Sequence, residues 1–132
     1  MSDKVFLDTN ILVYSYSVSE KDKQLTARKL ITKTDSHIST QVLTELSNTL
    51  TRKFKLPFDG ALKAIDECCA NNQVFINNPE TIKEAIKVAD KYRFSFYDSL
   101  IISAAIESGC KILYSEDMHH GQVIEKKLTI MN

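Results

Sequence analysis

The chain has 132 residues, of which 43% are hydrophobic and 26% charged, and this composition excludes a largely disordered protein. Seventeen basic and seventeen acidic residues give a formal net charge of zero, which argues against a protein that coats DNA through a basic surface. We expect a single domain over residues 1–132, since one core typically serves on the order of 100–200 residues.

Signals for export, membrane insertion and disulfide bonding are not found in the sequence. Residues 1–10 lack the apolar run and cleavage site of a signal peptide. The longest apolar run, residues 100–106, is far shorter than the roughly 18 residues of a membrane helix. Three cysteines, two of them adjacent, form no Cys-x-x-Cys pair and favour neither a disulfide framework nor a zinc site. We therefore expect a reduced, cytoplasmic protein without a membrane partner.

Strands and helices are expected to alternate along the chain. The first half predicts strands at 4–7 and 37–39, and helices at 11–16, 19–32 and 41–53. The second half predicts helices from Pro57 to about residue 72, from Pro79, and from the N-cap Ser95 to Ser108, and strands at 73–76 and 111–115. Gly109 is typical of a left-handed helix end, and one last short strand is expected within 123–130.

This alternation predicts an α/β fold with three layers, α/β/α, in which helices flank a short central parallel sheet. In such sheets, ligands bind beyond the carboxyl ends of the strands. The helix that begins at Pro79 has an apolar stripe, which we expect to face the core. The stripe consists of Ile82, Ala85, Ile86 and Ala89. We also expect Tyr14, Tyr16 and Tyr97 to pack in the core rather than to stack on nucleic-acid bases.

Four acidic residues lie at the predicted carboxyl edge of the sheet or beside apolar helix faces. Asp8 directly follows the first strand and Asp117 follows the strand that ends at Ser115, so both belong at the carboxyl edge of the sheet. Asp98 lies on the same side of its helix as the apolar residues three, four and seven positions further on, and Glu45 borders the apolar face of its own helix. Carboxylates in such places are costly to bury unless another group balances their charge.

A divalent cation would provide that balance. Two carboxylates about 4 Å apart repel each other by about 4 kcal/mol at an effective dielectric constant of about 20. Because the four acids offer only oxygen ligands, Mg²⁺ is the expected cofactor and Mn²⁺ an alternative. Each acid also has a structural explanation: Asp8 can cap a helix, Asp98 can form a capping box with Ser95, Glu45 can be a surface residue, and Asp117 can belong to a loop. These structural roles, however, would not require all four acids to lie at the same edge of the sheet.

Four segments of the chain resemble, in order, the four motifs of PIN domains. They are Val5-Phe6-Leu7-Asp8-Thr9-Asn10-Ile11-Leu12, Thr44-Glu45-Leu46, Phe96-Tyr97-Asp98-Ser99-Leu100-Ile101 and Ile112-Leu113-Tyr114-Ser115-Glu116-Asp117-Met118. The size of the chain and the segment His119-His120-Gly121-Gln122 are similar to those of the toxins of VapBC-type toxin–antitoxin pairs. Ser115 stands where threonine is commoner, and the motif places the fourth acid on Asp117 rather than on its neighbour.

The resemblance implies a PIN-like fold and assigns roles to these residues. Asp8 and Asp98 would bind the metal directly, Glu45 and Asp117 would complete the catalytic set, and no other cofactor is implied. Three polar residues would orient the carboxylates or bound water: Thr9, Asn10 and Ser115.

The implied activity is that of a Mg²⁺-dependent endoribonuclease that cuts a structured RNA such as tRNA or rRNA. By the same resemblance we expect a small cognate antitoxin and a homodimer. A non-catalytic PIN-like module that binds RNA or protein, and a housekeeping PIN nuclease without an antitoxin, remain open. An aspartyl phosphatase is disfavoured, because it would have Asp-x-Asp after the first strand where this chain has Asp8-Thr9-Asn10.

Overall fold

A computed structural model describes residues 3–132 of the chain. Within them, one six-stranded sheet has the strand order β3-β2-β1-β4-β6-β5. The strands are β1 (Lys4–Leu7), β2 (Asp35–Ser39), β3 (Gln73–Phe75), β4 (Ile112–Tyr114), β5 (Val123–Ile124) and β6 (Leu128–Met131). All neighbouring strands from β3 to β6 pair in parallel, and β5 alone pairs antiparallel, with β6. The expected parallel sheet is therefore confirmed, with an antiparallel strand added at one edge.

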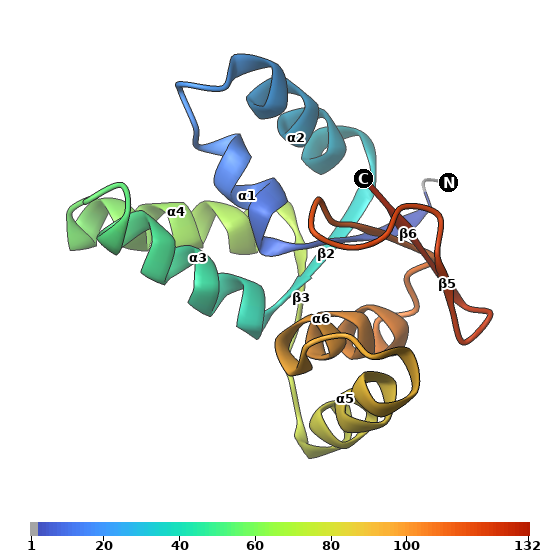
Figure 1. The fold of residues 1–132 in the computed structure, drawn as a ribbon. Helices are drawn as coiled ribbons and strands as arrows, with labels where there is room; N and C mark the ends of the chain where they lie inside the picture. Colours follow the sequence, from blue (N-terminus) through green and yellow to red (C-terminus); the bar gives the residue numbers. More distant parts are fainter. Residues whose placement is uncertain (1–2) are drawn as a thin grey trace.

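Helices flank this sheet on two sides. They are α1 (Thr9–Ser15), α2 (Lys21–Lys33), α3 (Thr40–Arg52), α4 (Phe58–Asn71), α5 (Pro79–Tyr92) and α6 (Phe96–Glu107). Figure 1 shows α1 to α4 toward the left and top of the view and α5 with α6 at the bottom, with strands between the two groups. Helix α5 packs against α6, while α1 packs against α2 and α3, and α3 packs against α4. The predicted α/β architecture is confirmed.

Short polar residues cap the starts of several of these helices. The Ser39 hydroxyl accepts a hydrogen bond from the backbone N–H of Val42 at the start of α3. Asn78 forms a capping box at the start of α5, with Pro79 in the first turn. At the other end of α6, Gly109 has a φ of 78°, a left-handed conformation that glycine adopts without steric cost.

The core lies on both faces of the sheet. The inner strands contribute fully buried side chains, among them Phe6, Leu7, Ile38 and Leu113. Helix α6 is buried on nearly all sides, because every residue from 99 to 105 is buried. A helix that is apolar all round is typical of such a central position. Phe96 and Tyr97 in its first turn are exposed, and Asp98, which is partly buried, lies where the helix enters the interior.

Two expectations differ from the structure. The last segment forms two strands rather than one, joined by a tight turn in which Glu125 and Lys126 both have positive φ, at 52° and 57°. Such turns normally contain Asn-Gly or Asp-Gly, so these residues carry no sequence signal for a hairpin. The expected stripe of α5 is also wrong in part, since Ile82 and Ile86 are 44% and 57% exposed and Val88 is buried instead. No helix in residues 3–132 is long and apolar enough to cross a membrane.

Candidate functional site

Asp8 lies at the carboxyl end of β1 and is the N-cap of α1, where its side chain is only 7% exposed. Its Oδ1 accepts a hydrogen bond of 2.7 Å from the backbone N–H of Thr9, and its Oδ2 accepts one of 2.7 Å from the Ser115 hydroxyl. Burial raises the pKa of Asp8 to about 6; the two hydrogen bonds oppose this rise, and the charges of Asp98 and Glu45 add to it. The capping role is thus real, and the charges of two other acids act on the same carboxylate.

Glu45 lies in the second turn of α3 and is held by donors at both carboxylate oxygens. The Thr9 hydroxyl donates to Oε1 over 2.5 Å, and the Gln41 side-chain amide donates to Oε2 over 3.3 Å. Thr9 therefore contacts two acids at once, Asp8 through its backbone and Glu45 through its side chain. This double contact fixes the second acidic motif against the first.

Asp98 lies in the first turn of α6 and is partly buried. Burial raises the pKa of its carboxyl above the ordinary value; the Ser95 side chain opposes the rise, and the charges of Asp117 and Glu45 add to it. The Ser95 hydroxyl accepts a 3.1 Å hydrogen bond from the backbone N–H of Asp98. Within the described residues only this half of the predicted capping box is present, so capping does not account for the Asp98 carboxylate.

Asp117 lies in the exposed loop after β4, and its Oδ2 accepts a 2.6 Å hydrogen bond from the Asn10 side chain. Its neighbour Glu116 has different partners. Contact with the Tyr14 hydroxyl, and then with Lys23, lowers the pKa of Glu116, and the Lys23 ammonium lies 3.3 Å from its carboxylate. The two adjacent acids are therefore distinct: Glu116 is paired with a cation, and Asp117 is held by a neutral amide.

Electrostatic coupling joins the four carboxylates, since Asp8 responds to Asp98 and Glu45, and Asp98 responds to Asp117 and Glu45. In the part of the chain that the structure describes, none of them forms an ion pair with lysine, arginine or histidine. The atoms that they offer to a metal ion are all carboxylate oxygens, which fits a divalent cation such as Mg²⁺.

The carboxylates do not form a ready-made metal cage. Across residues 3–132, no three His, Cys, Asp or Glu side chains lie close enough together to hold a metal ion. Like charges repel, and each of three acids here turns to a neutral donor: Asp8 to Ser115, Glu45 to Thr9 and Asp117 to Asn10.

Two residues at this site differ from what the sequence suggested. Gln41 was not singled out, although it lies one helical turn before Glu45, a spacing at which side chains meet on one helix face. Tyr97 was expected in the core, but it is 65% exposed beside Asp98, with its ring 5.6 Å from that of Phe96. By contrast Tyr16 is partly buried, as expected, and its hydroxyl donates to the carbonyl of Ala64.

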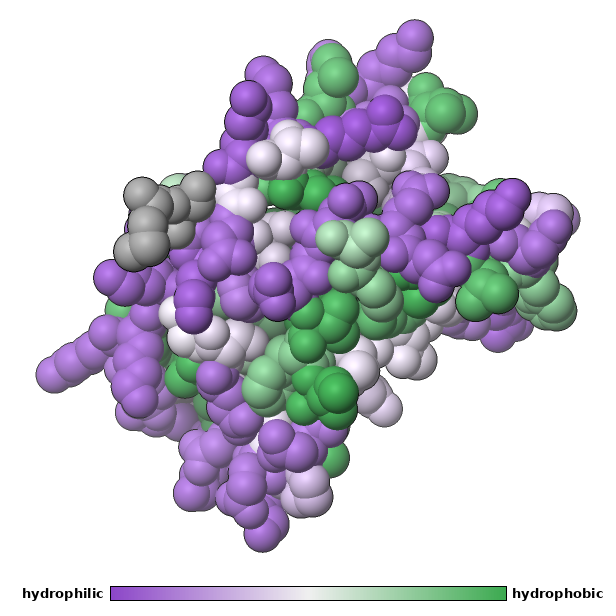
Figure 2. All heavy atoms as spheres, turned by 180° about the vertical axis from the view of Figure 1, so that it is seen from behind, coloured by the Kyte–Doolittle hydropathy of each residue, from purple (hydrophilic) through white to green (hydrophobic). Residues whose placement is uncertain are grey.

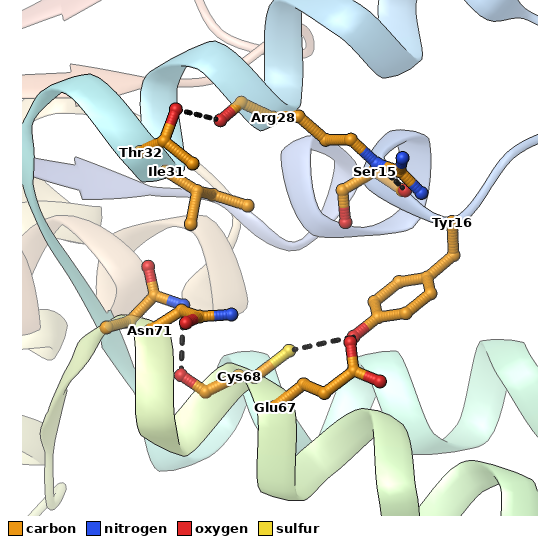
Figure 3. Close-up of a pocket in the computed structure, with 9 residues that line it drawn as sticks. Ser15, Tyr16, Arg28, Ile31, Thr32, Glu67, Cys68 and Asn71 are labelled. Carbon is orange, nitrogen blue, oxygen red and sulfur yellow. Dashed lines mark hydrogen bonds between the residues drawn. The ribbon is translucent and has the colours of Figure 1, made fainter.

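A cavity of about 380 Å³ lies away from the acids, between α1, α2 and α4. Figure 3 shows that the Tyr16 hydroxyl faces the sulfur of Cys68 across it, at 3.9 Å, with Glu67 beside them and Arg28 on the opposite helix. None of the four carboxylates lines this cavity. These four carboxylates, Asp8, Glu45, Asp98 and Asp117, which we call the acid cluster, are therefore separate from this cavity.

A family model described as the PIN domain matches residues 5–125. Three solved structures share the fold. VapC20 of Mycobacterium tuberculosis, described as a sarcin-ricin loop cleaving toxin, is 18% identical, with 86% of this chain and 89% of that chain covered and a TM-score of 0.70. VapBC2 of Rickettsia felis, bound to a DNA fragment from its promoter, is 18% identical, with 98% of each chain covered and a TM-score of 0.68. A toxin–antitoxin complex of Klebsiella pneumoniae is 12% identical, with 97% and 96% covered and a TM-score of 0.72.

A comparison with curated protein sequences gave no match. The identities to the solved structures are low, so these likenesses establish the fold alone. The match to the family model is independent of them, and it contains all four segments that carry the acids.

Proposed function

The chain belongs to the PIN-domain family, and on that basis we propose that it is a single-domain, cytoplasmic, Mg²⁺-dependent endoribonuclease, the toxin of a VapBC-type pair. Its substrate would be a structured RNA such as tRNA or rRNA. The observation that carries this proposal is a set of four carboxylates from separate parts of the chain, linked through the couplings of Asp8 and Asp98 and without a basic partner among the described residues. The structural neighbours, which include a protein described as a sarcin-ricin loop cleaving toxin, support it.

Each acid has a role in this proposal. Asp8 and Asp98 bind the ion directly, and Glu45 and Asp117 complete the site. When bound, Mg²⁺ supplies a water of lowered pKa and offsets negative charge on the phosphate. Ser115 opposes the desolvation of Asp8 and so favours the ionised carboxylate that an ion requires. One of the four carboxylates would accept the proton of the attacking water.

Supporting polar residues keep these acids in place. Thr9 links Asp8 to Glu45, and Asn10 draws the loop that carries Asp117 toward the first turn of α1. Because these donors are neutral, they orient the carboxylates without cancelling their charge. Outer-shell partners of this kind typically contribute about 10–100-fold in metal affinity or activity.

A small antitoxin and a second copy of the chain are the proposed protein partners. One structural neighbour is described as a toxin–antitoxin complex and another as VapBC2, which supports the antitoxin. Ile82 and Ile86 on α5, and Ile76 just before that helix, are exposed large apolar side chains of the kind that a protein contact buries. Figure 2 shows apolar side chains gathered across the middle of one face, with hydrophilic side chains above and below them.

One observation favours an alternative. Because no three acids converge in residues 3–132, the site as it stands also fits a PIN-like module that binds RNA or protein without cutting it. A housekeeping PIN nuclease without an antitoxin would share the same acids, and growth arrest on expression would separate that function from a toxin.

The decisive test is cleavage of total RNA by the purified, antitoxin-free protein in Mg²⁺, in Mn²⁺ and in EDTA. Asp98→Asn is the test variant. Glu116→Gln is its matched control, because Glu116 is paired with Lys23 outside the acid cluster. Discrete fragments that need the metal, disappear in Asp98→Asn and persist in Glu116→Gln would support the nuclease. Folded protein that leaves several RNA pools intact would favour the binding module.

A further inference from the structure

Gln41 makes two hydrogen bonds that fix the orientation of its side chain. Its Nε2 donates to Oε2 of Glu45 over 3.3 Å and to the backbone carbonyl of Tyr97 over 3.1 Å. Both partners only accept hydrogen bonds, so the amide cannot be turned around. Its Oε1 is consequently directed elsewhere, where it is buried and has no hydrogen-bond partner among the described residues.

This orientation has a cost, because a buried carbonyl oxygen without a donor has lost its hydration and gained nothing in return. An apolar side chain of the same length would fill the space without that loss. The cost of the unpaired Oε1 is explained if the two hydrogen bonds that Nε2 donates are the function of Gln41.

The two hydrogen bonds connect two acid-bearing helices. Glu45 lies on α3, and Tyr97 directly precedes Asp98 in the first turn of α6. Throughout residues 3–132, the Gln41–Tyr97 contact is the one side-chain hydrogen bond between α3 and α6. Since Thr9 holds the other oxygen of Glu45, the carboxylate is fixed from both sides, and Gln41 ties it to the helix of Asp98.

We propose that Gln41 is a positioning residue that sets the separation of the Glu45 and Asp98 carboxylates for metal binding. This inference rests on the proposed function, since it assumes that these acids share an ion. A neutral amide suits the task better than lysine or arginine, whose charge would neutralise Glu45 and compete with the cation. A carboxylate at this position would instead repel Glu45 and the Tyr97 carbonyl.

Two variants of the full chain test the proposal. Gln41→Met keeps the length of the side chain and removes both polar groups, and Gln41→Glu replaces the donor by a charged acceptor. Asn48→Met, at an exposed position of the same helix with no side-chain hydrogen bond in the described structure, is the matched control. Mn²⁺ affinity is measured by calorimetry on protein whose melting temperature is recorded, and kcat and KM are measured separately on a cleaved RNA.

We expect Gln41→Met to weaken Mn²⁺ binding and lower kcat by about 10–100-fold, with KM and melting temperature close to those of the wild type. Gln41→Glu should lose more than Gln41→Met, and Asn48→Met should lose nothing. Mn²⁺ affinity of Gln41→Met equal to that of Asn48→Met would overturn the proposal, as would a loss explained by unfolding of both Gln41 variants.

The outcomes separate this inference from the proposed function. Wild-type protein that cleaves RNA, with Gln41→Met equally active and equally able to bind Mn²⁺, refutes the role of Gln41 and leaves the nuclease standing. Wild-type protein that binds Mn²⁺ but cuts no RNA refutes the nuclease, while the fall in affinity in the Gln41 variants still supports the positioning role. Wild-type protein that binds no Mn²⁺ refutes both.

Discussion

The hydroxyl of Ser115 donates a 2.7 Å hydrogen bond to Oδ2 of Asp8, two residues that lie 107 positions apart in the sequence. The pairing of the strands makes this contact, because the N–H of Asp8 bonds to the carbonyl of Tyr114 and the N–H of Ser115 bonds to the carbonyl of Met131. The serine thus places a donor against a carboxylate whose burial favours the protonated form.

Replacing Ser115 by alanine should raise the pKa of Asp8 above its value of about 6, because the hydrogen bond that favours the ionised form is lost. One hydrogen bond to a buried charge corresponds to a shift of about one pKa unit. The midpoint of Mn²⁺ binding against pH should move up by about that amount, measured by calorimetry at several pH values. Ser108→Ala, whose hydroxyl donates to a carbonyl at the far end of α6, is the control. An unchanged midpoint would contradict the expectation.

Asp8→Asn should stabilise the metal-free protein at neutral pH. Folding raises the pKa of this carboxyl from 3.8 to about 6, so the folded state holds the proton more tightly than the unfolded state. The resulting stability is fully present below pH 3.8 and is lost as the pH rises through about 6. A shift of about 2 units corresponds to roughly 3 kcal/mol at pH 7, which is an upper estimate.

Urea unfolding in EDTA at pH 7 and near pH 4 measures this effect. We expect a gain of about 1–3 kcal/mol for Asp8→Asn at pH 7 and little difference near pH 4. Asp66→Asn, at an exposed position of α4, serves as the control. A variant less stable than the wild type at pH 7 would show that the carboxylate contributes more by its hydrogen bonds than it costs by its burial.

The three thiols should differ sharply in reactivity. Cys69 is exposed, while Cys68 and Cys110 are buried. Burial raises the pKa of Cys68 above its ordinary value and that of Cys110 to about 12, and it is the thiolate that reacts. Native protein should therefore release one equivalent of thionitrobenzoate quickly from Ellman's reagent, and three after denaturation. Cys69→Ser should abolish the fast phase, and its persistence in that variant would contradict the buried positions of the other two.

Arg93→Gly should make the fold more stable. Arg93 is the C-cap of α5 and has a φ of 65°, a conformation in which a side chain is unfavourable and glycine is not. We expect a gain of up to about 1 kcal/mol in the free energy of unfolding. Asp90→Gly, inside the same helix, should instead lose about 1 kcal/mol. Denaturant titration of both variants measures the difference, and equal changes would refute the role assigned to the backbone at Arg93.

Sequence patterns predicted the architecture because they depend on short-range rules. The alternation of strands with amphipathic helices predicted the parallel sheet, and Pro79 and Ser95 predicted the starts of α5 and α6. The positions of Asp8 and Asp117 after two strands also follow from the chain alone, since these strands, β1 and β4, proved to be direct neighbours in the sheet.

Other features depend on contacts that no short segment specifies. Gln41 bonds to Tyr97, which is 56 positions away, so its role requires the relative placement of two helices. The hairpin of β5 and β6 turns through Glu125 and Lys126 without a glycine, and the strands rather than the turn residues must enforce its shape. The distance between like-charged carboxylates is set by competing donors, which the order of motifs does not reveal.

The pairing of Ser115 with Met131 has a consequence for how the protein is made. Asp8 precedes Ser115 by 107 positions, and the serine that holds its carboxylate is in turn fixed by β6, which is synthesised later still. A nascent chain that still lacks β6 has its acids but not the strand that aligns them. The site can therefore assemble only after β6 has been synthesised, and chains truncated before β6 should lack an ordered one.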